Sequence, residues 1–597
     1  MKKLLKYLDN YKKESILGPL FKLLEAAFEL LVPLVMSAII DQGIAQGDTS
    51  YILRMCLLLV ALGLVGLICS VTAQYFAAKA AVGFATRLRR ALFGHIQTLS
   101  YSEMDTVGAS TLITRMTSDI NQVQNGLNLT LRLLLRSPFV VFGSMVMAFT
   151  IDVQAALVFA VVIPVLCVVV FGIMLAGMPL YKKVQKGVDR ILGITRENLT
   201  GVRVIRAFGR EGDETAGFDR ENEALTRMQT LVGKISALMN PVTYVIINAG
   251  LLAILWQGGI SVDTGRLTQG QVVALINYMS QILVELIKMA NLIITITKAL
   301  ACAARIQSVF DEKSSLEEEG TLCVRAAEDE TEESKTTYGA EVVFDHVGMT
   351  YKNAGAESLT DISFTARPGD TIGIIGGTGS GKTSLVNLIP RFYDVSSGSV
   401  TVDGRDVRKL SLEELRSQIG VVPQKARLFA GTIRENLLWG DEKADEDRLW
   451  GALETAQARE FVEKKEDGLD ARVTQGGSNF SGGQRQRLTI ARALVRKPRI
   501  LILDDSASAL DFATDAALRR SIRQMKEAPT VFIVSQRTSS IRYADRIIVL
   551  DDGRMAGIGT HDELLESCPV YREIYDSQFD NGGTGADERR DQKWEQK

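Results

Sequence analysis

Six apolar stretches, each long enough to cross a bilayer, constrain this sequence more than any other feature. A helix needs about 20 residues to cross the hydrocarbon core, and other structures are largely excluded there because every backbone polar group must be satisfied internally. The front half of the 597-residue chain is therefore predicted to be an all-α domain with six membrane spans. The spans are expected near residues 15–40, 52–80, 130–150, 154–180, 240–260 and 271–298.

The charges between these stretches predict the orientation of the domain. Lys and Arg residues precede the first span and follow the second and the fourth, whereas the opposite connections carry Asp41, Asp48, Asp152 and Asp263 against Arg266 alone. Positive charge marks the cytoplasmic side, and an even number of spans returns the chain to the side on which it starts. We expect a multi-pass protein of the cell membrane with both termini in the cytoplasm.

The formal net charge of −2 is a cancellation between two halves. The first 310 residues carry 29 Lys and Arg against 20 Asp and Glu, a net charge of +9, and the remaining residues carry a net charge of −11. The positive half has no cationic face with interleaved aromatic residues, so nucleic acid is not an expected partner. The six cysteines form no CxxC pair, which favours buried free thiols over disulfides or a metal site.

Two polar stretches between the spans, 81–129 and 181–235, keep a helix-like apolar periodicity. We expect the second to fifth spans to continue as helices into the cytoplasm, where a domain could dock on segments 101–119 and 197–211. The alternative is that these segments are solvated helical extensions with no part in transmission.

Charged residues inside the spans are candidates for a cavity. Ionisable groups at membrane depth cost several kcal/mol unless they face the bundle interior or water. Glu29 and Glu285 are the best candidates for a substrate cavity. In the alternative interpretation, Lys288 neutralises Glu285, and Arg132 and Arg136 extend toward the inner interface.

Composition also predicts the domain boundaries. Residues 311–335 carry ten acidic side chains with little periodicity, as in a solvated linker, and strand and turn patterns follow. The expected divisions are a membrane domain at 1–311, an acidic linker at 312–340, an α/β domain at 341–578 and a polar tail at 579–597.

A phosphate-binding motif opens the second domain. Residues 371–384 read TIGIIGGTGSGKTS, an apolar strand followed by the GxxxxGK[ST] spacing at Gly376–Thr383 and then a helix. The glycines let backbone amides surround phosphates, Lys382 reaches the terminal phosphates, and Thr383 offers a hydroxyl to Mg²⁺. Farther along, the buried strand RILILDD places Asp504 to hold the Mg²⁺ shell.

A second anion-binding element lies between them. The string NFSGGQRQR contains an SGGQ turn, Ser481–Gln484, that opens a helix and presents backbone amides and a hydroxyl to an anion. Together with Gln424 in VVPQ and with SALD at Ser508–Asp511, these motifs resemble those of the ABC transporter ATPases. Six spans and the segment ENLTGVRVIRAF extend the resemblance to an exporter half-transporter with a fused ATPase, so it covers nearly the whole chain.

The resemblance implies a multidomain fold, with an all-α six-helix transmembrane domain followed by an α/β P-loop ABC ATPase domain, and a site for ATP and Mg²⁺. Tyr351 is expected to stack on adenine, and Thr383, Gln424 and Asp504 to hold Mg²⁺. The implied ATP-binding residues are Tyr351, Gly376, Gly377, Thr378, Gly379, Ser380, Gly381, Lys382, Thr383, Ser384 and Gln424.

The resemblance also implies a partner chain. In this family two ATPase domains close head to tail, and six spans make only half of the usual pathway. The signature residues Ser481, Gly482, Gly483 and Gln484 would therefore contact ATP in the partner's site, next to the D-loop residue Asp511.

The sequence departs from the family pattern at two catalytic positions. Asp505 stands where the family has a Glu, and Gln536 stands where it has a switch-loop His. Asp is shorter by about 1.5 Å, and a displacement of about 1 Å can cost roughly 100-fold in rate. Gln536 can accept or donate a hydrogen bond but cannot carry positive charge. We expect this chain's own site to bind ATP and hydrolyse it slowly.

An impaired site beside an intact signature favours a heterodimer, as in the degenerate-site subunits of bacterial heterodimeric multidrug exporters. The alternative is a weak homodimer, because Asp can act as a base. The expected activity is ATP-driven export of amphipathic or drug-like molecules from the cytoplasm or inner leaflet of a bacterial inner or plasma membrane. A lipid flippase, a peptide exporter and an ATP-gated or regulatory membrane protein are the alternatives.

Overall fold

The computed structural model of the chain describes residues 3–316, 338–352 and 354–579. It divides into two compact units: unit 1 is Met1–Thr98 with Ala109–Lys313, and unit 2 is Leu99–Gly108 with Ser314–Lys597. Most of the predicted linker and nearly all of the predicted tail lie outside the described residues.

The described elements of unit 1 are helices. Six of the helical stretches found in the described part of the chain are long and apolar enough to cross a membrane, which confirms the prediction of six spans. The elements are a 3₁₀ helix (Leu4–Tyr11), α1 (Lys12–Ala38), a π-helical turn (Ile39–Ile44), α2 (Thr49–Thr98), α4 (Ala109–Thr114), a second π-helical turn (Arg115–Asp119), α5 (Ile120–Leu133), α6 (Arg136–Ile151), α7 (Val153–Ala207), α8 (Glu211–Ala237), α9 (Met239–Asp263) and α10 (Gln269–Asp311).

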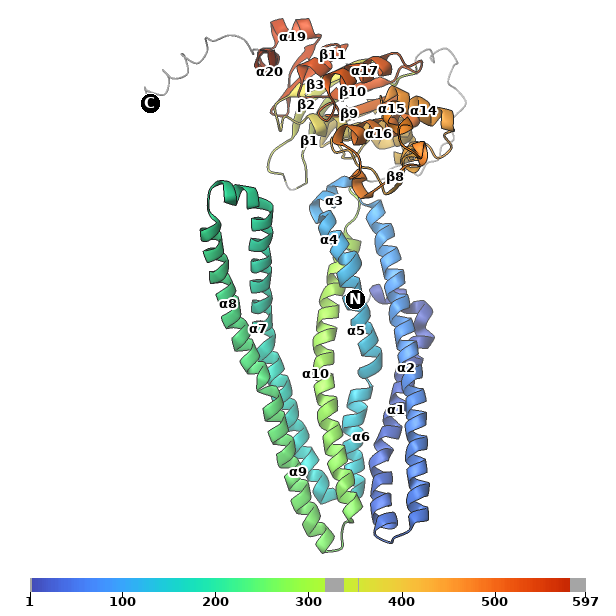
Figure 1. Cartoon of the computed structure of the whole chain (residues 1–597), viewed down its shortest axis with the longest axis vertical. Coiled ribbons are helices and arrows are strands. Elements are labelled where there is room, and N and C mark those ends of the chain that lie inside the picture. The colour runs from blue at the N-terminus through green and yellow to red at the C-terminus, as the bar shows by residue number, and fades with distance from the viewer. Residues whose placement is uncertain (1–2, 317–337, 353, 580–597) are drawn as a thin grey trace, which may run out of the picture. The chain divides into compact units, whose positions relative to one another are not determined.

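Several of these helices are much longer than a bilayer requires. α2 has 50 residues and α7 has 55, which at 1.5 Å per residue is about 75–80 Å, against a hydrocarbon core of about 30 Å. The predicted continuation of the spans as helices is therefore confirmed. α7 and α8 run side by side (Figure 1) and are joined by a turn at Gly209, whose φ of +62° suits glycine because it lacks a Cβ.

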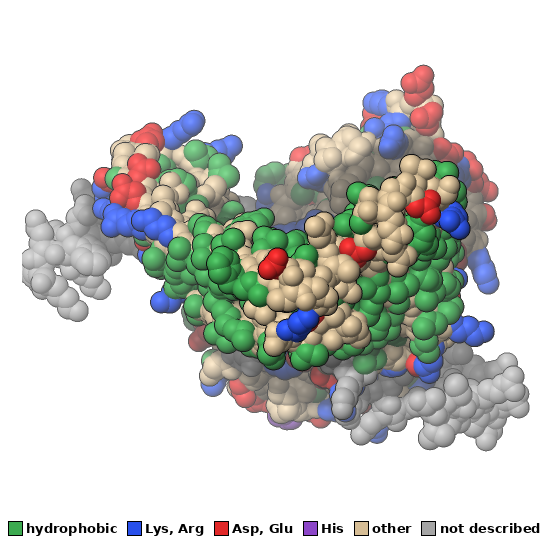
Figure 2. All heavy atoms as spheres, turned by 90° about the horizontal axis from the view of Figure 1, so that it is seen from below, with side chains coloured by type: hydrophobic (Ala, Val, Ile, Leu, Met, Phe, Trp, Pro, Cys, Tyr) green, Lys and Arg blue, Asp and Glu red, His purple; other side chains and the backbone are tan. Residues whose placement is uncertain are grey.

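Unit 1 is apolar both inside and on its flanks. Phe159, Leu275 and Tyr278 are fully buried in its core. The hydroxyl of Tyr278 donates to the carbonyl oxygen of Leu30 at 2.6 Å, which ties α10 to α1. Many large hydrophobic side chains of these helices are exposed, and in the view from below hydrophobic surface surrounds the ends of the helices (Figure 2). Such an outer surface would be costly in water and suits contact with lipid tails.

Unit 2 is an α/β structure. Its strands are β1 (Val342–Met349), β2 (Leu359–Ala366), β3 (Thr371–Gly376), β4 (Ser397–Val402), β5 (Arg405–Asp406), β6 (Ile419–Val422), β7 (Gly431–Thr432), β8 (Arg472–Val473), β9 (Ile500–Asp504), β10 (Thr530–Val534), β11 (Arg546–Asp551) and β12 (Arg554–Gly559). Its α-helices are α3 (Tyr101–Val107), α11 (Lys382–Leu388), α12 (Leu412–Ser417), α13 (Ile433–Leu438), α14 (Glu446–Thr455), α15 (Arg459–Glu463), α16 (Gly482–Val495), α17 (Phe512–Arg523), α18 (Thr538–Ile541), α19 (His561–Ser567) and α20 (Pro569–Phe579).

Two sheets organise this unit. The larger has the strand order β12-β11-β3-β10-β9-β6, and its five strands β11, β3, β10, β9 and β6 run parallel. The smaller is antiparallel and has the order β2-β1-β4-β5. Because parallel strands end at the same edge, the loops that follow β3, β10, β9 and β6 are brought together there.

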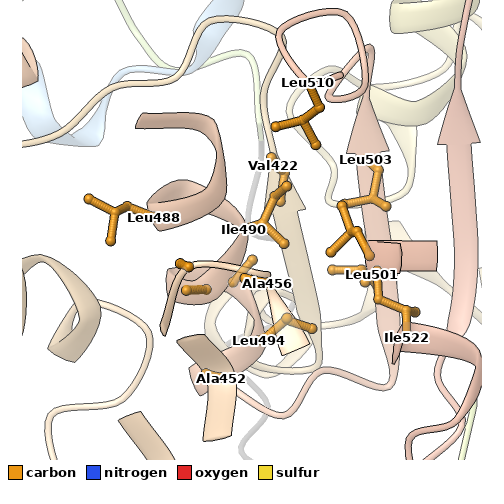
Figure 3. Close-up of a cluster of buried hydrophobic side chains, with 14 of the residues drawn as sticks. Val422, Ala452, Ala456, Leu488, Ile490, Leu494, Leu501, Leu503, Leu510 and Ile522 are labelled. Carbon is orange, nitrogen blue, oxygen red and sulfur yellow. The ribbon is translucent and has the colours of Figure 1, made fainter. Parts of the chain in front are cut away.

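The core on one side of the larger sheet fixes α16. Leu501 and Leu503 of β9 and Val422 of β6 lie near Ile490 and Leu494 of α16 (Figure 3), and all five side chains are buried. Burial of such a side chain contributes about 1.5–3 kcal/mol. This packing holds the helix that begins with the signature motif.

Leu99–Gly108 does not follow the predicted boundary, because it groups with unit 2 although it lies within residues 1–311. The ring of Tyr101 lies 4.6 Å from that of Phe392, and the hydroxyl of Tyr393 donates to Asp105 at 2.6 Å. Burial raises the pKa of Tyr393, as does its hydrogen bond to Asp105. These contacts join residues nearly three hundred positions apart in the sequence.

Candidate functional site

Most of the predicted site residues of unit 2 gather at the carboxyl edge of the parallel strands β3, β10, β9 and β6. The glycine-rich loop follows β3, Gln536 follows β10, Asp505 follows β9 and Gln424 follows β6. The order of the strands in the sheet therefore brings together site residues that are spread over 160 residues of the sequence.

The loop Gly376–Thr383 has the shape that a phosphate cradle requires. Gly379 and Gly381 have φ values of +86° and +92°, a region that side chains disfavour. A Cβ at Gly381 would lie 2.8 Å from the carbonyl oxygen of Ser358, so the fold leaves no room for one. The backbone at Gly377 and Gly379 is open, since a Cβ there would meet nothing within 4 Å.

Lys382 is the cation of this loop. Its ammonium donates to the carbonyl oxygens of Gly376 at 2.9 Å and Gly377 at 2.6 Å. Burial lowers the pKa of Lys382, and the negative charges of Asp505 and Asp504 partly offset this effect. Lys382 is thus a desolvated cation held at the mouth of the loop, which favours contact with phosphate.

The two predicted metal ligands that follow β3 and end β9 are in contact. The hydroxyl of Thr383 donates to the carboxylate of Asp504 at 3.1 Å. Burial raises the pKa of Asp504; the hydrogen bond from Thr383 works in the opposite direction. A hydroxyl beside a buried carboxylate is a donor set of hard oxygens that fits Mg²⁺.

Gln424 and Asp505 also meet at this edge. The amide nitrogen of Gln424 donates to Asp505 at 3.3 Å, and the backbone amide of Asp505 donates to Val534 at the end of β10. Asp505 has a φ of +46°, so its carboxylate is aimed by a backbone conformation that few non-glycine residues adopt.

Gln536 is exposed, and its loop is held by a residue that the sequence did not reveal. Gln578 of α20 donates to the carbonyl oxygen of Gln536 at 2.7 Å. Its side-chain oxygen accepts hydrogen bonds from the backbone amide and the hydroxyl of Thr538, both at 2.9 Å. Gln578 therefore fixes both sides of the switch loop. It belongs to no recognisable motif, so only the fold identifies it.

Tyr351 lies beside the phosphate loop. Its hydroxyl is 2.8 Å from that of Ser384, the residue after Thr383, and its ring makes an edge contact with Tyr393 at 5.1 Å. Tyr393 in turn binds Asp105 of α3. A continuous row of side chains thus connects α3 to the start of α11.

The signature motif is accessible at the beginning of α16. Ser481 and Gly482 are exposed, and a Cβ at Gly482 would meet nothing within 4 Å. Ser481 accepts a hydrogen bond from the amide of Gln484, whose side chain accepts one from the amide of Ser481. The helix that follows belongs to a different core cluster from the helix after the phosphate loop. Asp511 caps α17 by accepting from the amide of Thr514 at 2.8 Å.

In unit 1, Glu29 and Glu285 converge on one arginine. Arg136 donates to Glu29 at 2.6 Å and to Glu285 at 2.5 Å. It is 6% exposed, so it does not extend toward the interface as one sequence interpretation proposed. Lys288 donates to Glu285 at 2.9 Å, as the same interpretation expected. Glu29 and Glu285 both line a cavity of about 510 Å³.

Comparisons with known proteins agree with this architecture. Two family models match: one described as the ABC transporter transmembrane region at residues 15–286, the other described as ABC transporter at residues 359–508. An uncharacterized ABC transporter ATP-binding protein of Mycobacterium tuberculosis is 40% identical over 96% of this chain and 97% of its own length. The ATP-dependent lipid A-core flippase of Chromobacterium violaceum is 30% identical over 97% of each chain.

The same architecture occurs in a solved structure. A bacterial Atm1-family ABC exporter with ATP bound matches with a TM-score of 0.77 over 95% of this chain and 99% of its own. Its sequence identity of 23% supports a shared fold.

Proposed function

The chain belongs to the ABC transporter family, in which a transmembrane region is joined to an ATPase domain, and from this premise we propose that it is one half of an ATP-driven exporter. The cargo is an amphipathic or drug-like molecule taken from the cytoplasm or inner leaflet. The observation that carries the proposal is the presence, in one chain, of a phosphate-binding sheet edge in unit 2 and a polar cavity among the membrane helices of unit 1.

The sheet edge of unit 2 supplies the binding groups for MgATP. The phosphate loop and Lys382 hold the phosphates, Thr383, Asp504 and Gln424 hold the metal, and Tyr351 packs against adenine. Bound Mg²⁺ neutralises phosphate charge. The contact between Thr383 and Asp504 and the openness of the loop support this assignment.

This chain's own site hydrolyses ATP slowly. The base position holds Asp505, whose carboxylate is shorter than that of the Glu usual in the family, and Gln536 brings no positive charge to the switch loop. Binding is retained because neither residue belongs to the phosphate loop. The main contribution of this site is therefore to bind ATP rather than to hydrolyse it.

The second half of the exporter is a different chain. The exposed Ser481 and Gly482 complete the partner's ATP site, and the partner supplies the Glu and His that this chain lacks. A homodimer would contain two impaired sites, whereas the heterodimer contains one efficient site.

The contacts of α3 connect the nucleotide site to the membrane helices through the chain itself. α3 lies between α2 and α4 in sequence, and Asp105, Tyr393, Tyr351 and Ser384 form a row to the phosphate loop. Closure of two ATPase domains on ATP moves α3, and the bundle turns from inward-facing to outward-facing. Both termini lie in the cytoplasm of a bacterial inner or plasma membrane.

A lipid flippase of the same architecture is the second candidate. The relative of Chromobacterium violaceum named as a lipid A-core flippase is similar over nearly the full chain, which favours a lipid among the possible cargoes. The two functions share the ATP site and differ in what enters the cavity of unit 1.

The test begins with purification of the tagged chain from its native membranes. We expect a second half-transporter to co-purify and the complex to accumulate a fluorescent amphiphile inside inverted vesicles when ATP is added. The chain alone should bind ATP with little turnover. Efficient hydrolysis by a homodimer would contradict the heterodimer, and ATP-dependent leakage down a gradient without accumulation would contradict export.

A further inference from the structure

Four charged side chains of unit 1 form a row of alternating sign across three helices. Glu29 of α1 accepts from Arg136 of α6, Arg136 donates to Glu285 of α10, and Lys288 of α10 donates to Glu285. Ser137 donates to the other oxygen of Glu285 at 2.8 Å. In Figure 1 these helices run alongside one another in unit 1.

The two middle residues of the row, Arg136 and Glu285, are buried, and the two end residues, Glu29 and Lys288, are partly exposed. The side chains of Arg136 and Glu285 are 7% and 3% exposed, whereas those of Glu29 and Lys288 are 39% and 42% exposed. Each buried charge has a partner of opposite sign on both sides, as a buried charge requires. Each end charge has a partner on one side only among the described residues. The row therefore ends in an accessible carboxylate and an accessible ammonium.

Both ends line the same cavity of about 510 Å³. One helical face of α1, at residues 29, 32, 33 and 36, forms one wall, and one face of α10, at residues 277, 280, 281, 284, 285 and 288, forms the other. Val32, Pro33 and Met36 give the cavity an apolar side next to the charges. The side-chain oxygen of Gln281 is also buried and has no hydrogen-bond partner among the described residues, so the wall offers a further acceptor.

The geometry points to a binding site for a zwitterionic amphiphile, a molecule with an apolar body and a head that carries both an ammonium and an anionic group. Its ammonium pairs with Glu29, its anionic group pairs with Lys288, and its apolar body lies against Val32, Pro33 and Met36. When such a molecule is bound, Glu29 and Lys288 each gain a second partner of opposite charge, so every charged side chain of the row lies between two opposite charges. This inference rests on the proposed function, because it names the cargo class of that exporter.

A singly charged amphiphile fits less well. A cation satisfies Glu29 but leaves Lys288 open, and an anion does the reverse; each also adds net charge to a row that is neutral as it stands. The site is therefore expected to select molecules that carry both a positive and a negative group over molecules that carry only one of them.

The experiment measures binding without ATP, so its failure would leave export itself standing. The full chain is released from a non-ionic detergent, and bound ligands are counted by native mass spectrometry. The zwitterionic probes are lysophosphatidylethanolamine and dodecyl sulfobetaine. The singly charged probes are lysophosphatidylglycerol, which keeps the phosphate and lacks the ammonium, and dodecylammonium. We expect both zwitterions to bind about tenfold more tightly than either singly charged probe.

Variants at the two ends separate a binding site from a structural clamp. Glu29→Gln should weaken both zwitterions about tenfold and should not weaken lysophosphatidylglycerol, because the row then carries a charge of +1 that an anion neutralises. Lys288→Met should weaken the zwitterions equally and should not weaken dodecylammonium, because the row then carries a charge of −1 that a cation neutralises. Glu14→Gln, a change on the same helix outside the cavity, should alter none of them. Melting temperatures of all variants report whether they fold.

Four outcomes decide the proposal. Tight binding of both zwitterions supports recognition of the charge pair alone, and tight binding of lysophosphatidylethanolamine alone supports a membrane lipid as the source of that pair. Equal binding of zwitterionic and singly charged probes would overturn the proposal. So would folded Glu29→Gln and Lys288→Met variants with unchanged selectivity, because the row would then only join the helices.

Discussion

At the residue scale, the proposed slow ATP hydrolysis depends on Asp505 and Gln536. Restoring the longer carboxylate and an ionisable ring with Asp505→Glu and Gln536→His should raise ATP turnover at this chain's own site by about tenfold or more, because a displacement of about 1 Å costs roughly 100-fold. Phosphate release is measured in the complex, in a Ser481→Ala background that silences the other site. Asp505→Asn is the matched control and should remove the residual activity. An unchanged rate in the restored variant would show that another feature limits the site.

In the proposed heterodimer, Ser481 contacts the partner's nucleotide rather than this chain's own. Ser481→Ala removes the hydroxyl at the exposed beginning of α16, so ATP turnover by the heterodimer should fall about tenfold or more, while ATP binding to this chain's own loop stays unchanged. The measurements are phosphate release and photolabelling with an azido-ATP. Ser508→Ala is the comparison variant, because it removes a hydroxyl that donates to the carbonyl oxygen of Asp505 in this chain's own site. Comparing the two variants distinguishes loss of activity at the partner's site from loss at this chain's own site. Full heterodimer activity with Ser481→Ala would refute the assignment of the signature.

At the scale of elements, α20 positions the switch loop through Gln578. Gln578→Leu removes three hydrogen bonds at the two sides of the loop, so turnover should fall several-fold while ATP binding remains. The effect is measured in the background that carries Asp505→Glu and Gln536→His. Ser577→Ala is the control, since its hydroxyl donates to the carbonyl oxygen of Ile574 in its own helix. Equal turnover in both variants would show that α20 has no influence on the loop.

The link from α3 to the phosphate loop depends on one hydroxyl. Because burial and Asp105 raise the pKa of Tyr393, the hydroxyl keeps its proton and donates at neutral pH. Tyr393→Phe should keep basal ATP turnover and abolish most of its stimulation by cargo. Asp105→Asn retains an acceptor oxygen and should keep most of the stimulation. Tyr338→Phe, which loses a hydrogen bond to Lys497 elsewhere in unit 2, is the control. Stimulation that survives Tyr393→Phe would exclude this link.

The sequence predicts what depends on length or on contiguous spacing. The six spans follow from runs of apolar residues, and the phosphate loop and the SGGQ turn follow from neighbouring residues whose chemistry needs that order. Long-range side-chain contacts leave no such pattern. Gln578 is 40 residues from Thr538, and Tyr393 is 288 residues from Asp105, so neither contact has a local signal. Arg136 was open to an interfacial interpretation because its partner Glu29 is 107 residues away.

For the molecule as a whole, Arg136 joins the first, third and last spans. Arg136→Met would leave the buried Glu285 with Lys288 as its one cationic partner among the described residues, which should cost roughly 3–5 kcal/mol of stability. The loss is measured as a lower unfolding midpoint in lipid nanodiscs. Nucleotide binding should persist, because the cores of unit 2 share no residues with that of unit 1. Arg266→Met, which breaks a more exposed pair with Asp152, should cost less than about 1 kcal/mol. Equal losses would show that burial of the row is not what makes it stabilising.

The row of Glu29, Arg136, Glu285 and Lys288 sums to zero, and a zwitterion bound at its ends adds no net charge. Carrying one elementary charge across a membrane potential costs or yields about 2.3 kcal/mol per 100 mV. A site that holds a zwitterion and has no net charge does not experience this energy. Movement of such a cargo would therefore neither cost nor yield energy from the membrane potential.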